Sequence, residues 1–182
     1  MAARSCSAWW SAASALSSES RPPPRLPNTF AHGFARVDSG GAWLCSWGRV
    51  RRIWADATVH VVNGQFAGRS LTYTVERDDG EKVVVTSALN RVEDFHHRLQ
   101  EKTTARLLVG ALLDLREGRP VNFGPIRATP DGLQVGAETH PWPTEGPAVL
   151  HEGIMRLPRV GRSPTVALAS EVANLVVLLE LP

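Results

Sequence analysis

Apolar and polar residues alternate along the first half of the chain, and this period of two is typical of half-buried β-strands. Residues 30–37 predict one strand, in which Gly33 marks a bulge or a close backbone approach. In the segment AWLCSW that follows, Trp43, Cys45 and Trp47 fall on one face. The next stretch, VRRIWADATVHVV, ends at an Asn-Gly dipeptide, which is typical of a two-residue hairpin loop. The pattern therefore predicts antiparallel strands joined by short turns.

The segment LTYTVERDDGEKVVVTS allows a prediction of register, because its turn at Asp78-Asp79-Gly80 can close in two ways. A two-residue loop would pair Val75 with Val84, whereas a three-residue loop shifts the pairing by one residue. The shifted register pairs Thr72 with Thr86, Tyr73 with Val85, Val75 with Val83 and Glu76 with Lys82. We predict this register, because it puts large apolar residues on one face and an ion pair on the other. Gly80 is then left-handed, Val84 is the one misplaced apolar residue, and the two acidic residues belong to the turn and not to a metal site.

A period near 3.6 replaces the period of two after this hairpin, which predicts a helix over residues 91–117. Its apolar positions are Val92, Phe95, Leu99, Leu107, Leu108, Ala111, Leu112 and Leu115. Asn90 is a favourable N-cap, and Gly118 is a typical helix end. The Thr-Thr pair at 103–104 is the weakest point, because β-branched polar residues favour helices least, so the stretch forms one long helix or two in sequence.

The stretch EGRPVNFGPIRAT ends this helix and begins a second series of short strands and turns. We predict a disordered N-terminal tail at 1–29, a first unit at 30–118 and a second, shorter unit at 119–182. Phe123 and Ile126 are expected to be buried in a packed seam between the units. Ser170 is expected to cap a closing helix over 171–181. The order of Phe, Trp, hairpin and helix recurs in both units, which is typical of an internal repeat, with chance placement of a few aromatic residues as the alternative.

Composition changes this picture little. The chain has 182 residues with 43% apolar and 21% charged residues, which are values of a folded chain and not of a disordered one. The net charge of +2 is too small to indicate nucleic-acid binding. All but two of the 20 basic residues are Arg, which we attribute to codon bias. The Ser-, Ala- and Pro-rich tail at 1–29 has a signal or transit peptide as its alternative interpretation.

Cys6 and Cys45 form no Cys-x-x-Cys motif, and no run of about 18 apolar residues predicts a transmembrane helix. His96 and His97 are neighbours on the predicted helix, about 100° apart, so they do not share a metal ion. The sequence has no nucleophile elbow, Walker loop or dinucleotide fingerprint. We therefore predict no catalytic residue, no cofactor and no metal, and a cytoplasmic or membrane-peripheral location.

One basic and aromatic cluster is present, formed by Arg49, Arg51, Arg52 and Trp54, with Trp47 beside them. Guanidinium groups beside an indole ring are suited to a phosphate, an acidic peptide or an anionic lipid headgroup. The alternative is that these arginines lie on the solvent face of a strand and alternate with core residues. We retain these four residues as the candidate site for an anion or a partner.

Several motifs occur in an order that resembles a known family: HGFARVDSGG, TYTVERDDG, LREGRPVNFGPI, DGLQVG with PW, and VANLVVLLEL. Over residues 30–181 the chain resembles an uncharacterised family of bacterial proteins with pleckstrin-homology-like (PH-like) domains. The resemblance implies an α+β fold: an antiparallel bent sheet or partly open barrel capped by a helix, followed by a second, shortened PH-like unit. Residues 143–147 depart from the family pattern, and the first loop, DSGG, lacks the basic residues of phosphoinositide-binding PH domains.

The family has no established activity, so the resemblance supplies no catalytic residues. It implies a non-enzymatic binding or scaffolding module whose partner is another protein or a peptide, because PH-like folds often take up a peptide along an open sheet edge. The alternative is a peripheral membrane adaptor that binds anionic lipid through Arg49, Arg51, Arg52 and Trp54. An uncharacterised enzyme is the third interpretation. Nucleic acid is not expected as a partner.

Overall fold

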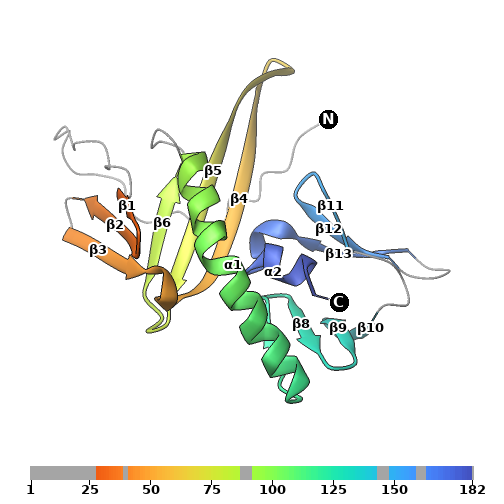
Figure 1. Ribbon diagram of the computed structural model, residues 1–182. Helices are drawn as coiled ribbons and strands as arrows, with labels where there is room; N and C mark the ends of the chain where they lie inside the picture. The colour runs from red at the N-terminus through yellow and green to blue at the C-terminus, as the bar shows by residue number, and fades with distance from the viewer. Residues whose placement is uncertain (1–27, 39–40, 87–91, 143–147, 159–162, 182) are drawn as a thin grey trace, which may run out of the picture.

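The computed structural model describes residues 28–38, 41–86, 92–142, 148–158 and 163–181, which form an α+β structure of antiparallel sheets and one main helix (Figure 1). The strands are β1 Asn28–Phe30, β2 Gly33–Asp38, β3 Gly41–Ser46, β4 Val50–Val62, β5 Gln65–Arg77, β6 Lys82–Thr86, β7 Val121–Asn122, β8 Ile126–Thr129, β9 Gly132–Val135, β10 Glu138–Pro141, β11 Val149–His151, β12 Ile154–Leu157 and β13 Thr165–Leu168. The helices are α1 Val92–Arg116 and α2 Leu175–Leu179, with 3-10 turns η1 Trp47–Arg49 and η2 Ala169–Glu171.

The described strands form four separate antiparallel sheets. Their orders are β1-β2-β3, β4-β5-β6, β10-β9-β8-β7 and β11-β12-β13. The expected antiparallel strands and capping helix are therefore present, but the described strands do not close into a barrel. The first two sheets lie beside each other and are joined through η1, where the chain turns from β3 into β4 (Figure 1).

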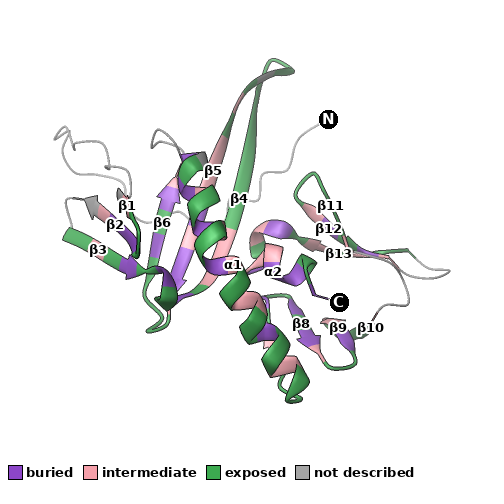
Figure 2. Cartoon of the chain, in the orientation of Figure 1, coloured by how far each residue is buried: buried purple, intermediate pink, exposed green. Residues whose placement is uncertain are grey.

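The hairpin of β4 and β5 contains the two longest described strands, with 13 residues each, and it projects beyond the rest of the molecule (Figures 1 and 2). Asn63 (φ 52°) and Gly64 (φ 78°) form its turn, as the Asn-Gly dipeptide predicts, because a two-residue loop of this type needs positive φ at both positions. The apolar side chains near its tip, Val59, Val61 and Val62, are exposed.

The register predicted for β5 and β6 is confirmed at all four pairs. Gly80 has φ +86°, as the three-residue loop requires, and Val84 is exposed, as expected of the one apolar residue on the outer face. Trp43, Cys45 and Trp47 all face the core side, and Leu44 between them is 63% exposed. Turn chemistry and the period of two therefore determine this part of the fold.

Helix α1 is one continuous helix of 25 residues that crosses two hydrophobic cores. The N-terminal region, β1–β6 with the first half of α1, contains the core of Phe34, Cys45, Trp47, Val50, Tyr73, Val75, Val83, Val85, Val92, Phe95 and Leu99. The C-terminal region, β7–β13 and α2 with the second half of α1, contains the core of Ala111, Phe123, Ile126, Ala128, Leu133, Met155, Leu157, Val172, Val177, Leu178 and Leu181. Thr103, expected to be a weak point, is buried between them, and its hydroxyl donates to Leu99 O at 2.7 Å, which satisfies the polar group within the helix.

The single strand predicted for residues 30–37 is wrong. A turn at Ala31 and His32 divides it into β1 and β2, which pair with each other. Gly33 does mark a close approach, because a Cβ at this position would lie 2.2 Å from Cys45 O. Strand β1 also begins at Asn28, so the last two residues assigned to the tail belong to a strand, whereas residues 1–27 lie outside the described part of the chain.

The continuous helix predicted over 171–181 is also wrong. The chain forms η2, breaks at Asn174 and resumes as the five-residue α2, so Ser170 lies within η2 and caps no helix. Asn174 has φ +50°, a left-handed conformation that an α-helix cannot contain. The seam residues Phe123 and Ile126 are buried as expected, and Phe123 O accepts a hydrogen bond from Ala173 N at 2.9 Å.

Candidate binding site at the edge of β4

Strand β4 is an edge strand, because its sheet has the order β4-β5-β6. It pairs with β5 without interruption from Arg52 to His60, and register shifts lie at either end of this stretch. A strand edge presents unpaired N–H and C=O groups to whatever lies beside it. The residues on the free side of β4 therefore decide what the edge can bind.

Asn174 occupies the first position on this edge. Ile53 N donates to Asn174 Oδ1 at 2.9 Å, and Asn174 N donates to Ile53 O at 2.7 Å. The Asn174 side chain also donates to Arg51 O at 3.0 Å. A single asparagine thus makes the hydrogen bonds that a neighbouring strand would make, and these bonds prove that the N–H and C=O of Ile53 point away from β5.

The outward direction recurs at every second residue, so Ala55, Ala57 and Val59 present their N–H and C=O groups to the same edge. Among the described residues, no strand pairs with β4 on this side. All three residues are exposed, and two of them carry only a methyl group (Figure 2). This edge can therefore receive an additional strand over about three hydrogen-bonded positions.

An apolar groove of about 230 Å³ lies beside this edge, between β4, α1 and α2. Ile53 and Ala55 form one wall, and Leu107, Leu150 and Leu175 contribute apolar surface around it. On an added strand, the residue paired with Ala55 would direct its side chain to the face that carries the groove. The groove is therefore placed to select an apolar side chain.

His96 on α1 also lines the apolar groove. Its ring stacks on Tyr73 at a centroid distance of 4.8 Å, and its Nδ1 is buried without a hydrogen-bond partner among the described residues. Burial, and secondarily the charge of His97, lowers the pKa of His96 below its ordinary value of 6.5. The groove therefore favours the neutral imidazole.

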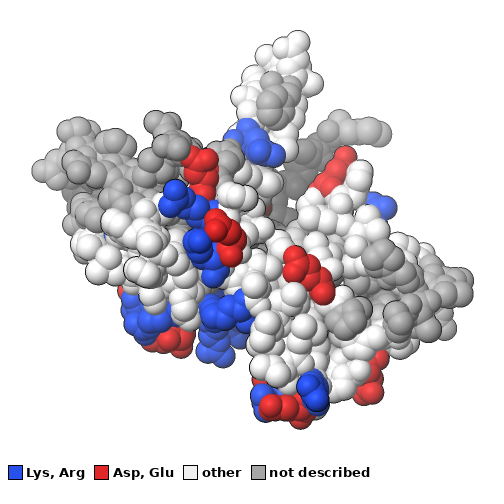
Figure 3. Space-filling model, viewed as in Figure 1, with Lys and Arg blue, Asp and Glu red and all other residues white. Residues whose placement is uncertain are grey.

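A second groove, of about 340 Å³, adjoins the first on the other side of Asn174. Arg51, Arg52 and Arg106 line it, with Asp114 as the single carboxylate. Arg106 donates to the carbonyl oxygens of Trp47 (3.2 Å) and Val50, which fixes its guanidinium at the start of β4. Basic side chains gather in this area beside the middle of α1 (Figure 3). We call this second groove the arginine groove. It is suited to an anion.

The four residues selected from the sequence do not form one cluster. Arg51 and Arg52 line the arginine groove, because a β-bulge at Arg51 breaks the alternation between Val50 and Arg52. Arg52 also pairs with the buried carboxylate of Glu76 at 3.2 Å. The Trp54 ring lies on the outer face of the sheet and is covered by Lys82 Nζ, 4.7 Å from the centroid.

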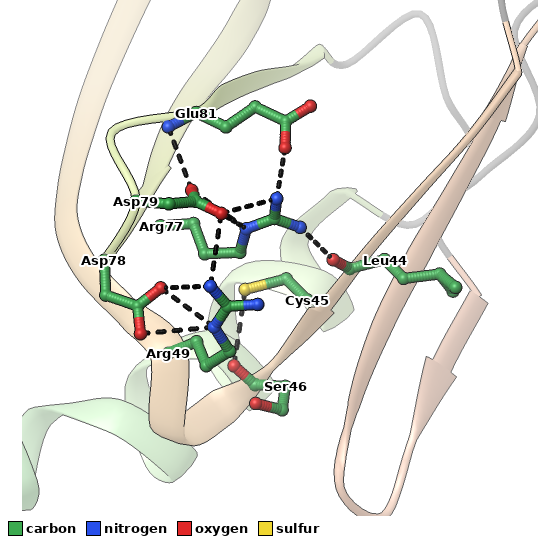
Figure 4. A network of polar contacts seen from close by, with 8 residues as sticks. All are labelled: Leu44, Cys45, Ser46, Arg49, Arg77, Asp78, Asp79 and Glu81. Atoms are coloured by element: carbon green, nitrogen blue, oxygen red, sulfur yellow. Dashed lines mark hydrogen bonds and ion pairs between the residues drawn. The ribbon is translucent and has the colours of Figure 1, made fainter.

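Arg49 is the last residue of η1, and its side chain points away from the other three toward the turn between β5 and β6 (Figure 4). It pairs with Asp78 at 2.7 Å and with Asp79 at 3.1 Å. Arg77 binds Asp79, Glu81 and the carbonyl oxygen of Leu44, so the network joins β3 to this turn. The hydrogen bond from Arg77 is the main reason that the pKa of Asp79 falls to about 2.

These contacts make the turn network structural. The hydrogen bond from Arg49 lowers the pKa of Asp78, and the same bonds raise the pKa values of Arg49 and Arg77. Burial raises the pKa of the neighbouring Cys45 thiol to about 11, which keeps it neutral. Among the described residues, no group of His, Cys, Asp or Glu side chains is arranged to hold a metal ion.

Sequence reasoning missed two residues of the site. Arg106 falls within the helix predicted over 91–117 and Asn174 within the helix predicted over 171–181, and neither was selected as a site residue. Asn is one of the few residues that tolerate the left-handed conformation, so an Asn inside the predicted helix was a sequence signal for a break at position 174.

The fold and the site define an α+β protein with an open strand edge beside an apolar groove and a basic groove. The chain belongs to a family of unknown function, DUF6585, whose model matches residues 28–181. No curated protein and no solved structure matches it. In the described part of the chain, no helix has the length and apolar character needed to cross a membrane.

Proposed function

We propose that this chain is a protein-binding module that takes up an extended peptide as an additional strand on the edge of β4. The observation that carries the proposal is the Asn174 contact, in which one residue already satisfies the outward N–H and C=O of Ile53. The next three outward positions, Ala55, Ala57 and Val59, offer the same groups to a partner. Backbone hydrogen bonds would supply affinity, and the apolar groove would supply specificity.

We further propose that the two regions are tandem PH-like units, the second one shortened. In each region antiparallel strands precede a helix, and the seam residues Phe123 and Ile126 are buried. The open edge of β4 beside α1 is the kind of peptide site that this fold offers. A crystal structure would test the assignment: the strands of residues 28–86 with α1 should superpose on a PH-like domain, and a different strand order would refute it.

Peripheral membrane binding is the alternative function, with less support from the geometry. Arg49 is paired with Asp78 and Asp79, and Arg52 with Glu76, so two of the three arginines are already compensated. Co-sedimentation with anionic vesicles of phosphatidylserine and phosphatidylcholine measures the remaining affinity. Salt-sensitive binding that Arg51→Glu with Arg52→Glu abolishes would favour this alternative over peptide binding.

The direct test uses random decapeptides displayed with either the N-terminus or the C-terminus free, selected on the immobilised full chain. Ala57→Pro is the informative variant, because it removes an N–H that faces away from β5 and leaves the β4–β5 pairing intact. Ala57→Ser is the matched control, since it changes the side chain and keeps the N–H. We expect the selected peptides to bind wild type and Ala57→Ser alike and to lose at least about tenfold in affinity for Ala57→Pro.

Two results would refute the proposal: no peptide is enriched in either library, or the enriched peptides bind Ala57→Pro as well as wild type. Circular dichroism and thermal unfolding of the three proteins would establish that the proline variant is folded. Amide shifts of Ala55, Ala57 and Val59 on peptide addition, followed by NMR, would locate the added strand.

A further inference from the structure

We infer that the arginine groove binds the C-terminal carboxylate of the peptide, so that the ligand is an extended segment that ends beside Asn174. The inference rests on the proposed strand addition and names the chemical class and direction of the ligand. Two observations carry it: the position of the groove at the closed end of the edge, and the side chains that line it.

The position follows from the order of residues along β4. Arg51 lies in the arginine groove, Ile53 is bound by Asn174, and Ala55 lies in the apolar groove. Leu107, Asn174 and Val177 line both grooves, so the grooves share a wall. A strand that adds at Ala55, Ala57 and Val59 cannot continue past Asn174, because that residue already holds the Ile53 position. The peptide must therefore end, or leave the sheet, at the entrance of the arginine groove.

The charges of the groove favour an anion at that point. Of the three arginines that line the groove, Arg52 is paired with Glu76 at 3.2 Å, and the one lining carboxylate, Asp114, is paired with Arg119 at 2.6 Å. Among the described residues, the Arg51 side chain makes no ion pair and is exposed. Arg106 donates to two backbone carbonyls through one Nη atom, which leaves its other N–H groups for a ligand. Asn122 and Asn174 add amide groups to the same groove.

The charges also select the direction of the peptide. A parallel strand would bring its N-terminal ammonium group to the arginine groove, where like charges repel. An antiparallel strand brings its carboxylate, which an arginine can bind through two N–H groups. Antiparallel pairing is also the geometry of every described pair of strands in this protein. The ligand is therefore an antiparallel peptide with a free C-terminus.

The experiment compares four synthetic forms of one selected peptide: the free acid, the C-terminal amide, the N-acetylated free acid, and an amide whose last residue is Glu. Each is titrated into the full chain, and binding is followed by fluorescence anisotropy. We expect the amide to bind about 10- to 100-fold more weakly than the free acid, as for the loss of a charge-assisted hydrogen bond, and N-acetylation to have no effect.

Arg51→Gln supplies the matched test in the protein. Arg51 is exposed and makes no described ion pair, so this variant should fold. It should weaken binding of the free acid to the level of the amide and leave binding of the amide unchanged. Equal binding of acid and amide by wild type, with loss in Ala57→Pro, would overturn the carboxylate inference and leave the strand addition standing. Equal binding of acid and amide by wild type that Ala57→Pro does not change would overturn both proposals.

The Glu-terminated amide distinguishes a C-terminal carboxylate from the carboxylate of an acidic side chain. Binding as tight as that of the free acid would assign the groove to an acidic side chain and overturn the proposed C-terminal anchor. Enrichment only in the library with a free N-terminus would also overturn it, and would leave the binding function intact.

Discussion

The N-terminal and C-terminal regions are stabilised by different kinds of contact, although α1 belongs to both. The N-terminal region has strands of up to 13 residues and a core in which aromatic rings contact one another. The centroid of the Phe34 ring lies 5.4, 5.2 and 5.1 Å from the ring centroids of Trp43, Trp47 and Phe95, respectively. The described strands of the C-terminal region have two to four residues, and Phe123 is the one Phe, Trp or Tyr that is buried among its described residues. Long strands and tilted or edge-to-face aromatic contacts stabilise the first region, whereas aliphatic packing against α1 stabilises the second.

The difference teaches where each region depends on the other. The N-terminal region has two three-stranded sheets and its own half of α1, so it contains the elements of an independent fold. The C-terminal region closes its core with Ala111 and with the partly buried Leu107, Leu108 and Leu115 of the same helix. Its short strands are joined to the rest of the molecule by α1 and by Asn174.

The largest effect is expected from Phe34→Ala, which breaks the aromatic core. Phe34 is 1% exposed and contacts three other rings, so its truncation should lower the free energy of unfolding by about 3–5 kcal/mol. Urea unfolding followed by circular dichroism measures this change. Leu44→Ala, on the exposed face of the next strand, is the control and should stay within about 0.5 kcal/mol. An equal effect of the two substitutions would contradict the described core.

Asn174→Gly should have the second-largest effect, because it removes the side chain that joins the C-terminal region to β4. Gly tolerates the positive φ, so the substitution isolates two lost side-chain hydrogen bonds, at about 1–3 kcal/mol in total. Urea unfolding should show the two regions separating into two transitions. Asn63→Gly, at a residue with almost the same φ on the exposed hairpin turn, controls for backbone effects. A smaller loss at Asn174 than at Asn63 would exclude this role.

A pH effect should be confined to the N-terminal region. Because the pKa of His96 is lowered in the folded protein, the unfolded chain binds more protons, and stability is lost as pH falls below 6.5. His96→Phe keeps a ring against Tyr73 and removes the titration, so the melting temperature should change less between pH 7.5 and 5.5 than in wild type. His151→Gln, at an exposed position of the C-terminal region, should leave the change of melting temperature with pH as it is in wild type. Identical slopes for wild type and His96→Phe would argue against the buried imidazole.

The smallest effect is expected at the exposed turn network. The pKa of Asp79 is lowered from 3.8 to about 2, so its contribution is complete above 3.8 and is lost as pH falls through about 2. Asp79→Asn should therefore lower the melting temperature slightly at pH 5 and by less near pH 2, where the Asp79 carboxyl is about half protonated. Asp131→Asn, in an exposed turn of the C-terminal region, should show no such difference. A difference in melting temperature between Asp79→Asn and wild type that stays the same at the lowest pH would refute the lowered pKa of Asp79.

Local signals explain which parts of the fold were predictable. The β5–β6 register and the helix limits follow from turn chemistry, side-chain period and a C-terminal glycine, all within a few residues of the element. The division of residues 30–37 and the break at Asn174 were not predictable in this way. Asn174 is fixed by Ile53, which lies 121 positions earlier in the chain, and no local pattern records that contact.

The candidate site was predictable in part for the same reason. Arg51 and Arg52 line the same groove, because they are adjacent in the sequence and lie at a bulge. Arg49 was grouped with them, but the acidic turn at Asp78 binds it instead. Arg106 comes from α1, and the open edge is a property of the sheet, so both required the tertiary structure.

The continuity of α1 has a consequence for the order of folding. Starting a helix is slow and unfavourable, whereas each added residue extends it readily. Once Phe95 and Leu99 dock on the aromatic core, the second half of α1 needs only extension past Thr103. The aliphatic core then assembles on a surface that already exists. We expect a refolding chain to bury Trp47 before Trp142, which fluorescence of variants with a single tryptophan would resolve in time.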